Sequence, residues 1–103
     1  MNTKLILTAL ICLFTFAASA KDGELWLEYQ GKPNLPGNGK TIVLIAGEIE
    51  YRSEETMPML ARLLSERHGF DCKLLFAINP ETGFIDPTVV NNIPGLHFLE
   101  SAD

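Results

Sequence analysis

The sequence predicts an α/β fold built around parallel strands, and three features indicate it. An uncharged, β-branched run at Thr41–Gly47 has the pattern of a strand that is covered on both faces. A helical pattern follows this run, and a second apolar run at Phe70–Ile78 follows the helix. Strand, helix and strand in this order are typical of a parallel crossover unit. We therefore expect Thr41–Ala46 to be a central strand of a doubly wound sheet.

Residues 21–39 precede this unit and are predicted to be a lead-in arm and loop. Glu24–Tyr29 alternates between polar and apolar residues, as an edge strand or an arm does. Glycine and proline then recur through residues 31–39, so that stretch is expected to be irregular.

The helix has the clearest signals in the chain. Its apolar stripe recurs at spacings of three and four residues, at Met57, Leu60, Ala61, Leu64 and His68. Proline is tolerated where backbone donors are unpaired, so Pro58 indicates the first turn and Thr56 the N-cap. Gly69 is expected to be the left-handed cap at the other end.

After the second strand, Asn79–Gly83 reads as a turn, and Pro94 indicates the first turn of another helix with Leu96 and Leu99 on one face. Two parallel strands with one and a half helices leave strand edges unpaired. Residues 40–103 are therefore expected to be an incomplete N-terminal β-α-β-α portion of a larger domain.

The first 20 residues read as a signal peptide. Lys4 supplies a positive start, Leu5–Ala17 is mostly apolar, and Ala18–Ala20 is a small-residue cleavage signal. The apolar run is shorter than the ~20 residues of a spanning helix, so a cleaved signal is preferred to a membrane anchor. We expect an exported protein, periplasmic or extracellular, that is cleaved near Ala20.

Composition excludes several classes of partner. The full chain carries a formal net charge of −5, and removal of Lys4 with the signal peptide makes the mature chain −6. An acidic surface without a lysine or arginine cluster disfavours nucleic acid and anionic membranes. Only Cys72 remains after cleavage, so no internal disulfide can form.

The densest polar cluster follows the first parallel strand. Ligands of open α/β sheets bind outside the carboxyl ends of the strands, so Glu48, Glu50, Tyr51 and Arg52 are predicted to line a ligand site. The alternative is a solvated loop in which Arg52 pairs with a neighbouring glutamate. No residue is assigned a catalytic role, because the separation of the carboxylates does not follow from sequence.

Other chemistry-bearing residues are predicted to be structural. Asn34–Thr41 resembles a phosphate-binding loop, but it lacks the first glycine and leads into a strand. Cys72 lies inside an apolar strand and is interpreted as a core residue. His68 and His97 show no metal-ligand spacing, so no metal or cofactor is indicated.

A series of short segments in the mature chain together resembles one family, the secreted ThuA-like proteins of trehalose utilisation. The segments are Lys40–Gly47, Glu50–Glu55, Leu63-Leu64, Arg67–Phe70, Phe76–Ile78, Gly83, Ile85–Pro87 and Asn92–Leu96. The resemblance implies a flavodoxin-like parallel sheet of the class I glutamine amidotransferase-like type and a link to carbohydrate metabolism. Glu48-Ile49 departs from the family pattern, in which an acidic pair that begins with aspartate is usual.

Three functional hypotheses follow from these observations. The first is an enzyme or enzyme-like domain that acts on a sugar outside the cytoplasm, and the second is a binding module for a sugar or other small molecule. The third is a truncated reading frame without activity of its own. The sequence indicates neither the reaction nor the oligomeric state.

Overall fold

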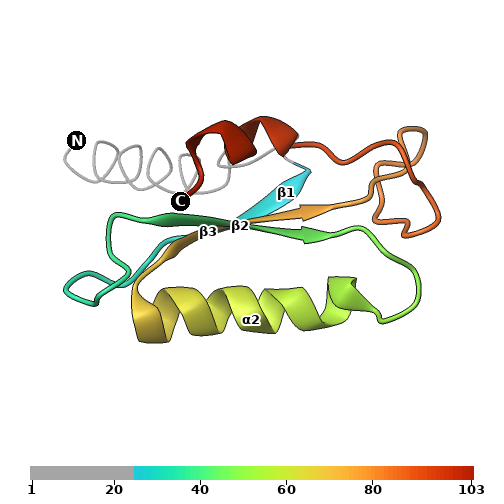
Figure 1. Ribbon diagram of the computed structural model, residues 1–103. Helices are drawn as coiled ribbons and strands as arrows, with labels where there is room; N and C mark the ends of the chain where they lie inside the picture. Colours follow the sequence, from blue (N-terminus) through green and yellow to red (C-terminus); the bar gives the residue numbers. More distant parts are fainter. Residues whose placement is uncertain (1–24) are drawn as a thin grey trace, which may run out of the picture.

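The computed structural model describes residues 25–103, so the predicted signal peptide lies outside the described residues. These residues form a small α/β unit with a three-stranded sheet (Figure 1). α2 lies on one face of the sheet, and η1, a 3-10 helix, lies on the other. In chain order the elements are β1 (Trp26–Tyr29), β2 (Thr41–Ala46), α2 (Ser53–His68), β3 (Asp71–Phe76) and η1 (Leu96–Ser101).

The strand order is β1-β3-β2, and the sheet is mixed. β2 and β3 run parallel, with Thr41 opposite Asp71 and Ala46 opposite Phe76, and α2 connects them. This confirms the predicted strand, helix and strand unit. β1 folds back antiparallel to β3, with Trp26 opposite Leu75, so the predicted edge strand is present.

The prediction that Thr41–Ala46 is the central strand is wrong for the described sheet. β3 is the middle strand, because β1 pairs with its second side, and β2 lies at an edge. Burial follows this order, since Leu74 and Leu75 of β3 are fully buried whereas Ile45 of β2 is exposed. The continuous apolar pattern of β2 therefore predicted neither its position in the sheet nor the burial of all its side chains.

The core lies between the sheet and α2. Leu74 and Phe76 of β3 pack with Ala46 of β2 and with Ile78, and Met57 of α2 covers them. Ala61 and Ser65 are also buried on the helix. Leu60 and His68 of the predicted stripe are exposed, and so is the neighbouring Leu63, so the buried face of α2 is narrower than its sequence pattern suggests.

α2 begins four residues earlier than the sequence predicted. Its N-cap is Arg52 and not Thr56, and Pro58 lies in the second turn, where it removes a single backbone hydrogen bond. The earlier start is possible because a carboxylate from the preceding loop binds the first amide of the helix, as described below. At the other end Gly69 is the left-handed cap, as predicted, with φ of 86°.

The C-terminal helix is also displaced from its prediction. Gly95 is the N-cap of η1, so Pro94 precedes the helix and is not in its first turn. Phe98, rather than Leu96 or Leu99, makes the main contact with the sheet, edge to face with the Trp26 ring at 5.3 Å. No helix within residues 25–103 is long and apolar enough to cross a membrane.

Candidate functional site

The loop between β2 and α2 is organised by the side chain of Glu48. One carboxylate oxygen of Glu48 accepts hydrogen bonds from the backbone N–H groups of Glu50 and Tyr51, each at 2.7 Å. The other oxygen accepts the N–H of Ser53, the first residue of α2, at 3.1 Å. The carboxylate thus satisfies backbone donors at the positive end of the helix, as a capping side chain would.

These bonds favour the ionised form of Glu48. The N–H of Tyr51 contributes most to a pKa below the ordinary value of 4.5, and the Ser53 hydroxyl and the Ser53 and Glu50 amides add to it. The Ser53 hydroxyl is buried close by but makes no hydrogen bond of standard geometry. Because its acceptors are occupied by its own loop, Glu48 positions the loop and is not free to receive a ligand.

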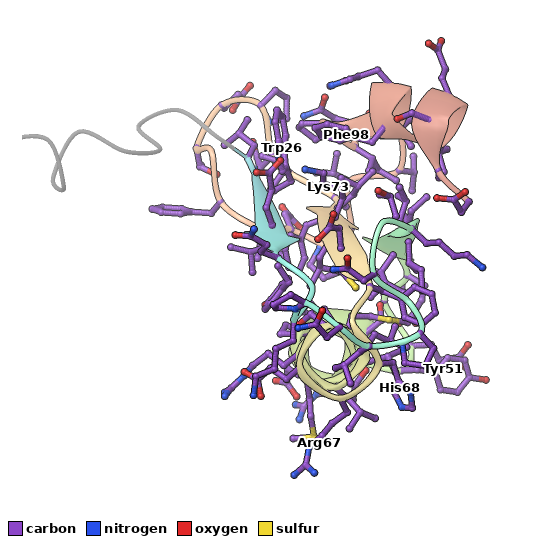
Figure 2. All side chains as sticks on the ribbon, turned by 90° about the vertical axis from the view of Figure 1, so that its left-hand side faces the viewer. Trp26, Tyr51, Arg67, His68, Lys73 and Phe98 are labelled. Atoms are coloured by element: carbon purple, nitrogen blue, oxygen red, sulfur yellow. The ribbon has the colours of Figure 1, made fainter. Side chains whose placement is uncertain are left out.

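The other three predicted site residues lie around this carboxylate. Arg52 adopts a left-handed backbone conformation, with φ of 54°, and its guanidinium lies 3.8 Å from Glu55. Both side chains of this pair are exposed to solvent, so the pair contributes little stability. Tyr51 is exposed and points away from the helix and sheet (Figure 2), and Glu50 is exposed beside it.

A second loop, after β3, reaches the same end of the sheet as the loop after β2 (Figure 1). Asn79 donates to the Asp86 carboxylate at 3.4 Å, and the Thr88 hydroxyl donates to it at 2.6 Å. The Thr88 hydroxyl contributes most to the lowered pKa of Asp86. The Asn92 amide group donates to the carbonyl of Ile78 and closes the loop.

Sequence patterns did not assign these loop residues to a site. Asn79–Gly83 was interpreted as a turn, and the side chains of Asn79 and Asp86 each begin a local turn. The same two dipeptides were the available signal for this polar network, but sequence alone does not show that Asn79 and Asp86 meet.

An apolar hollow of about 200 Å³ lies near the same end of β3. None of the four predicted site residues lines it. Its walls come from β1, β3 and the loop after β3, and consist of Leu25, Trp26, Leu27, Phe76, Ile78, Gly83 and Ile85. Its volume is smaller than the roughly 300 to 1,000 Å³ of typical small-molecule pockets, so it does not by itself form a ligand site.

Cys72 is buried in β3, which confirms its interpretation as a core residue. Burial raises the pKa of its thiol, and the charge of Asp71 adds to the effect. A thiol of this kind is a poor nucleophile. No group of three or more histidine, cysteine or acidic side chains that could hold a metal occurs within residues 25–103.

Comparison of the chain with protein-family models, with curated proteins and with solved structures returned no significant match.

Proposed function

We propose that this chain is the N-terminal part of an exported ThuA-like domain, linked to carbohydrate utilisation of the trehalose type, with a ligand site at the carboxyl end of β2. The ordered series of motif segments in residues 40–96 supports the family. The small-residue signal at Ala18–Ala20 supports export. The molecular activity we propose for the described part is recognition of a sugar or a similar small polar molecule.

In the complete domain we propose a flavodoxin-like sheet of the class I glutamine amidotransferase-like type, in which a further strand lies beside β2. The outer edge of β2 supports this proposal. There the N–H of Asp103 donates to the Thr41 carbonyl and the Thr41 N–H donates to the Asp103 carboxylate, both at 2.9 Å. Asp103 thus already binds the first residue of β2 on the side away from β3.

The main support for the proposed site is that the residues of the loop after β2 have different roles. Glu48 holds the loop backbone, and the side chains of Tyr51 and Arg52 are exposed at the sheet end where α/β proteins bind ligands. A tyrosine ring offers an apolar face with a hydroxyl, and a guanidinium offers five N–H donors. These groups suit a sugar, which presents both C–H faces and hydroxyl oxygens.

The first candidate is an enzyme or enzyme-like domain that acts on the sugar it recognises, and the second is a binding module without chemistry of its own. It is favoured by the state of Cys72, since the one thiol of the described residues is buried and has a raised pKa. The two candidates share the same ligand site, and they differ in whether the bound sugar is changed.

Titration of the exported full chain with trehalose and other disaccharides, followed by NMR or calorimetry, tests the site. We expect Tyr51→Ala and Arg52→Ala to weaken binding at least tenfold, a typical effect when a hydrogen-bonding or stacking group is lost. Arg62→Ala is the matched control, because its side chain is 67% exposed, against 77% for Arg52, and also pairs with a glutamate.

Unchanged affinity in both loop variants would refute the proposed location of the site. Absence of any sugar binding to the wild-type chain would refute the proposed class of ligand. Product analysis of the same mixtures separates the two candidates, because only an enzyme converts the disaccharide.

A further inference from the structure

A groove runs along the side of α2 that faces away from the sheet. Met59, Arg62, Leu63 and Glu66 recur at spacings of three and four residues, so their side chains lie on one face of the helix. Two hollows on this face, of about 370 and 710 Å³, share Glu66 and Arg67 in their walls. Together they form one groove, the α2 groove, which extends to the last turn of the helix.

The loop after β1 forms the second wall of the α2 groove. The N–H of Lys32 donates to the carbonyl of Ser65 at 2.9 Å, and the N–H of Gly37 donates to the carbonyl of His68 at 2.7 Å. These bonds hold the loop against the end of α2 (Figure 1). Lys32 and Leu35 line the larger hollow from this side. The fold thus brings together side chains that are far apart in the sequence.

Cations outnumber anions around the α2 groove. Lys32, Arg62 and Arg67 line it, against one acidic residue, Glu66, which pairs with Arg62 at 3.4 Å. Lys32 and Arg67 form no ion pair within residues 25–103, and Arg67 extends away from the helix and sheet (Figure 2). The groove therefore carries a local excess of positive charge on a chain whose net charge is −5.

Exposed apolar side chains accompany these cations. Met59 and Leu63 are 76% and 50% exposed, and Leu35 adds apolar surface from the loop. Apolar groups that are surrounded by polar ones on an exposed surface are typical of a protein interaction site. The groove therefore fits a partner that presents both apolar and acidic side chains.

The length of the α2 groove suits a short extended segment. A helix rises about 1.5 Å per residue, so Pro58 to Arg67 spans roughly 14 Å. An extended chain advances about 3.3 Å per residue, and about four or five residues cover this distance. Exposed ion pairs contribute little each and are screened by salt, so a contact of this size binds weakly and is sensitive to salt.

We propose that the α2 groove is a docking site for an acidic segment of a partner protein that also carries apolar side chains. Carboxylates of the segment pair with Lys32 and Arg67, and an apolar side chain packs on Leu63. Charge complementarity favours a short segment over a membrane or a nucleic acid, because an extended anionic partner would also meet the acidic remainder of the surface. The proposed sugar site lies on the loop before α2, so this inference does not rest on it.

Titration of the exported full chain with a synthetic peptide tests the docking site. The peptide has about eight residues, is rich in glutamate and contains a pair of leucines. We expect NMR shift changes at Lys32, Leu63 and Arg67, and an affinity that falls as NaCl is raised from about 0.05 to about 0.5 M. A peptide with lysine in place of each glutamate should not bind, and one with serine in place of each leucine should bind more weakly.

Charge reversal tests the pairing with the cations. Lys32→Glu and Arg67→Glu are each expected to weaken binding of the acidic peptide at least about tenfold, because they place like charges against it. Lys40→Glu is the matched control and should bind as wild type does. Lys40 is exposed and follows the same loop, it lines neither hollow, and its reversal changes the net charge by the same amount.

Replacement of a leucine tests the apolar contact. Leu63→Ser is expected to weaken binding of the acidic peptide roughly fivefold, because it removes apolar surface that the peptide covers. Leu99→Ser is the matched control, since Leu99 is also 50% exposed but lies on η1, across the sheet from α2. Circular dichroism shows whether each variant is folded, and folding is expected to persist because all the substituted side chains are at least partly exposed.

Four results would overturn the proposal. The first is no binding of the acidic peptide at about 1 mM, and the second is an equal effect of Lys32→Glu, Arg67→Glu and Lys40→Glu, which would show a response to net charge alone. The third is tighter binding of single-stranded DNA or of phosphatidylserine vesicles than of the peptide. The fourth is a dimer of the chain alone in sedimentation that Arg67→Glu dissociates, because a second copy would then occupy the groove.

Discussion

Replacement of Leu74 by alanine tests whether β3 is the middle strand of the sheet. Leu74 is fully buried, and its neighbours across the sheet are Leu27 of β1 and Leu44 of β2. The substitution removes three carbon atoms, worth about 0.8 kcal/mol each in transfer free energy, and leaves a cavity. We expect a loss of about 3 to 5 kcal/mol in the free energy of unfolding.

The same substitution in the neighbouring strands provides the comparison. Leu44 is half-buried, so Leu44→Ala is expected to lose about half as much, roughly 1.5 to 2.5 kcal/mol. Leu27 is exposed at the outer strand, and Leu27→Ala should lose less than about 1 kcal/mol. Urea titration followed by circular dichroism measures all three differences.

A folded unit of this size is marginally stable, so Leu74→Ala can leave too little folded protein to titrate. Leu74→Val removes one methylene and is expected to lose about 1 kcal/mol, or about 4 to 8 °C in melting temperature. A Leu44→Ala variant that loses as much as Leu74→Ala would refute the reasoning. It would place β2, and not β3, at the centre of the core.

Three further predictions concern the loop, the helix cap and the thiol. The lowered pKa of Glu48 stabilises the fold above its unfolded value of 4.5, and this stabilisation is lost as the pH falls through the folded pKa. Glu48→Gln should therefore be less stable than wild type at pH 7, and the difference should narrow in urea titrations as the pH falls below 4.5. A difference that does not change with pH would contradict this role of Glu48, and Glu50→Gln is the control. Gly69→Ala should lose more stability than Gly39→Ala. Both glycines have a positive φ, of 86° and 87°, but only Gly69 is crowded, because a carbon of Leu35 lies 2.7 Å from the position of an added Cβ. Equal melting temperatures of the two variants would contradict the close packing at the end of α2. Cys72 should resist a thiol reagent in the folded protein and react in urea, and rapid native labelling would show that β3 is not buried.

Sequence patterns predicted the elements that local chemistry specifies. Gly69 ends α2 because a left-handed residue is needed there, and the alternating segment before residue 30 forms the edge strand β1. The parallel pairing of β2 with β3 follows from the helix between them. These features depend on residues that are close together in the sequence.

Features that depend on distant or side-chain contacts were not predictable in the same way. The position of β3 in the middle of the sheet arises from the return of β1, which pairs with residues more than 40 positions away. The start of α2 was misplaced because Pro58 was interpreted as a first-turn signal, whereas Glu48 binds the Ser53 amide and extends the helix. Backbone capping by a carboxylate five residues upstream has no simple sequence pattern.

The candidate site has some features that were predictable from the sequence and others that were not. The location of the polar cluster at the carboxyl end of β2 was predictable from the order of elements. The different roles within it were not, because sequence does not distinguish Glu48, which binds its own loop, from the exposed Tyr51 and Arg52. The alternative of an Arg52 ion pair with a nearby glutamate is also present, at 3.8 Å from Glu55.

Amide hydrogen exchange along β2 in the exported chain is the most direct test of the sheet arrangement on which the whole account depends. The Thr41 N–H points away from β3, toward Asp103, so by alternation those of Val43 and Ile45 also point away and those of Ile42 and Leu44 point toward β3. We expect slow exchange at Ile42 and Leu44 and fast exchange at Val43 and Ile45. Equally slow exchange at all four amides would show that β2 is enclosed on both sides and would contradict the edge position described here.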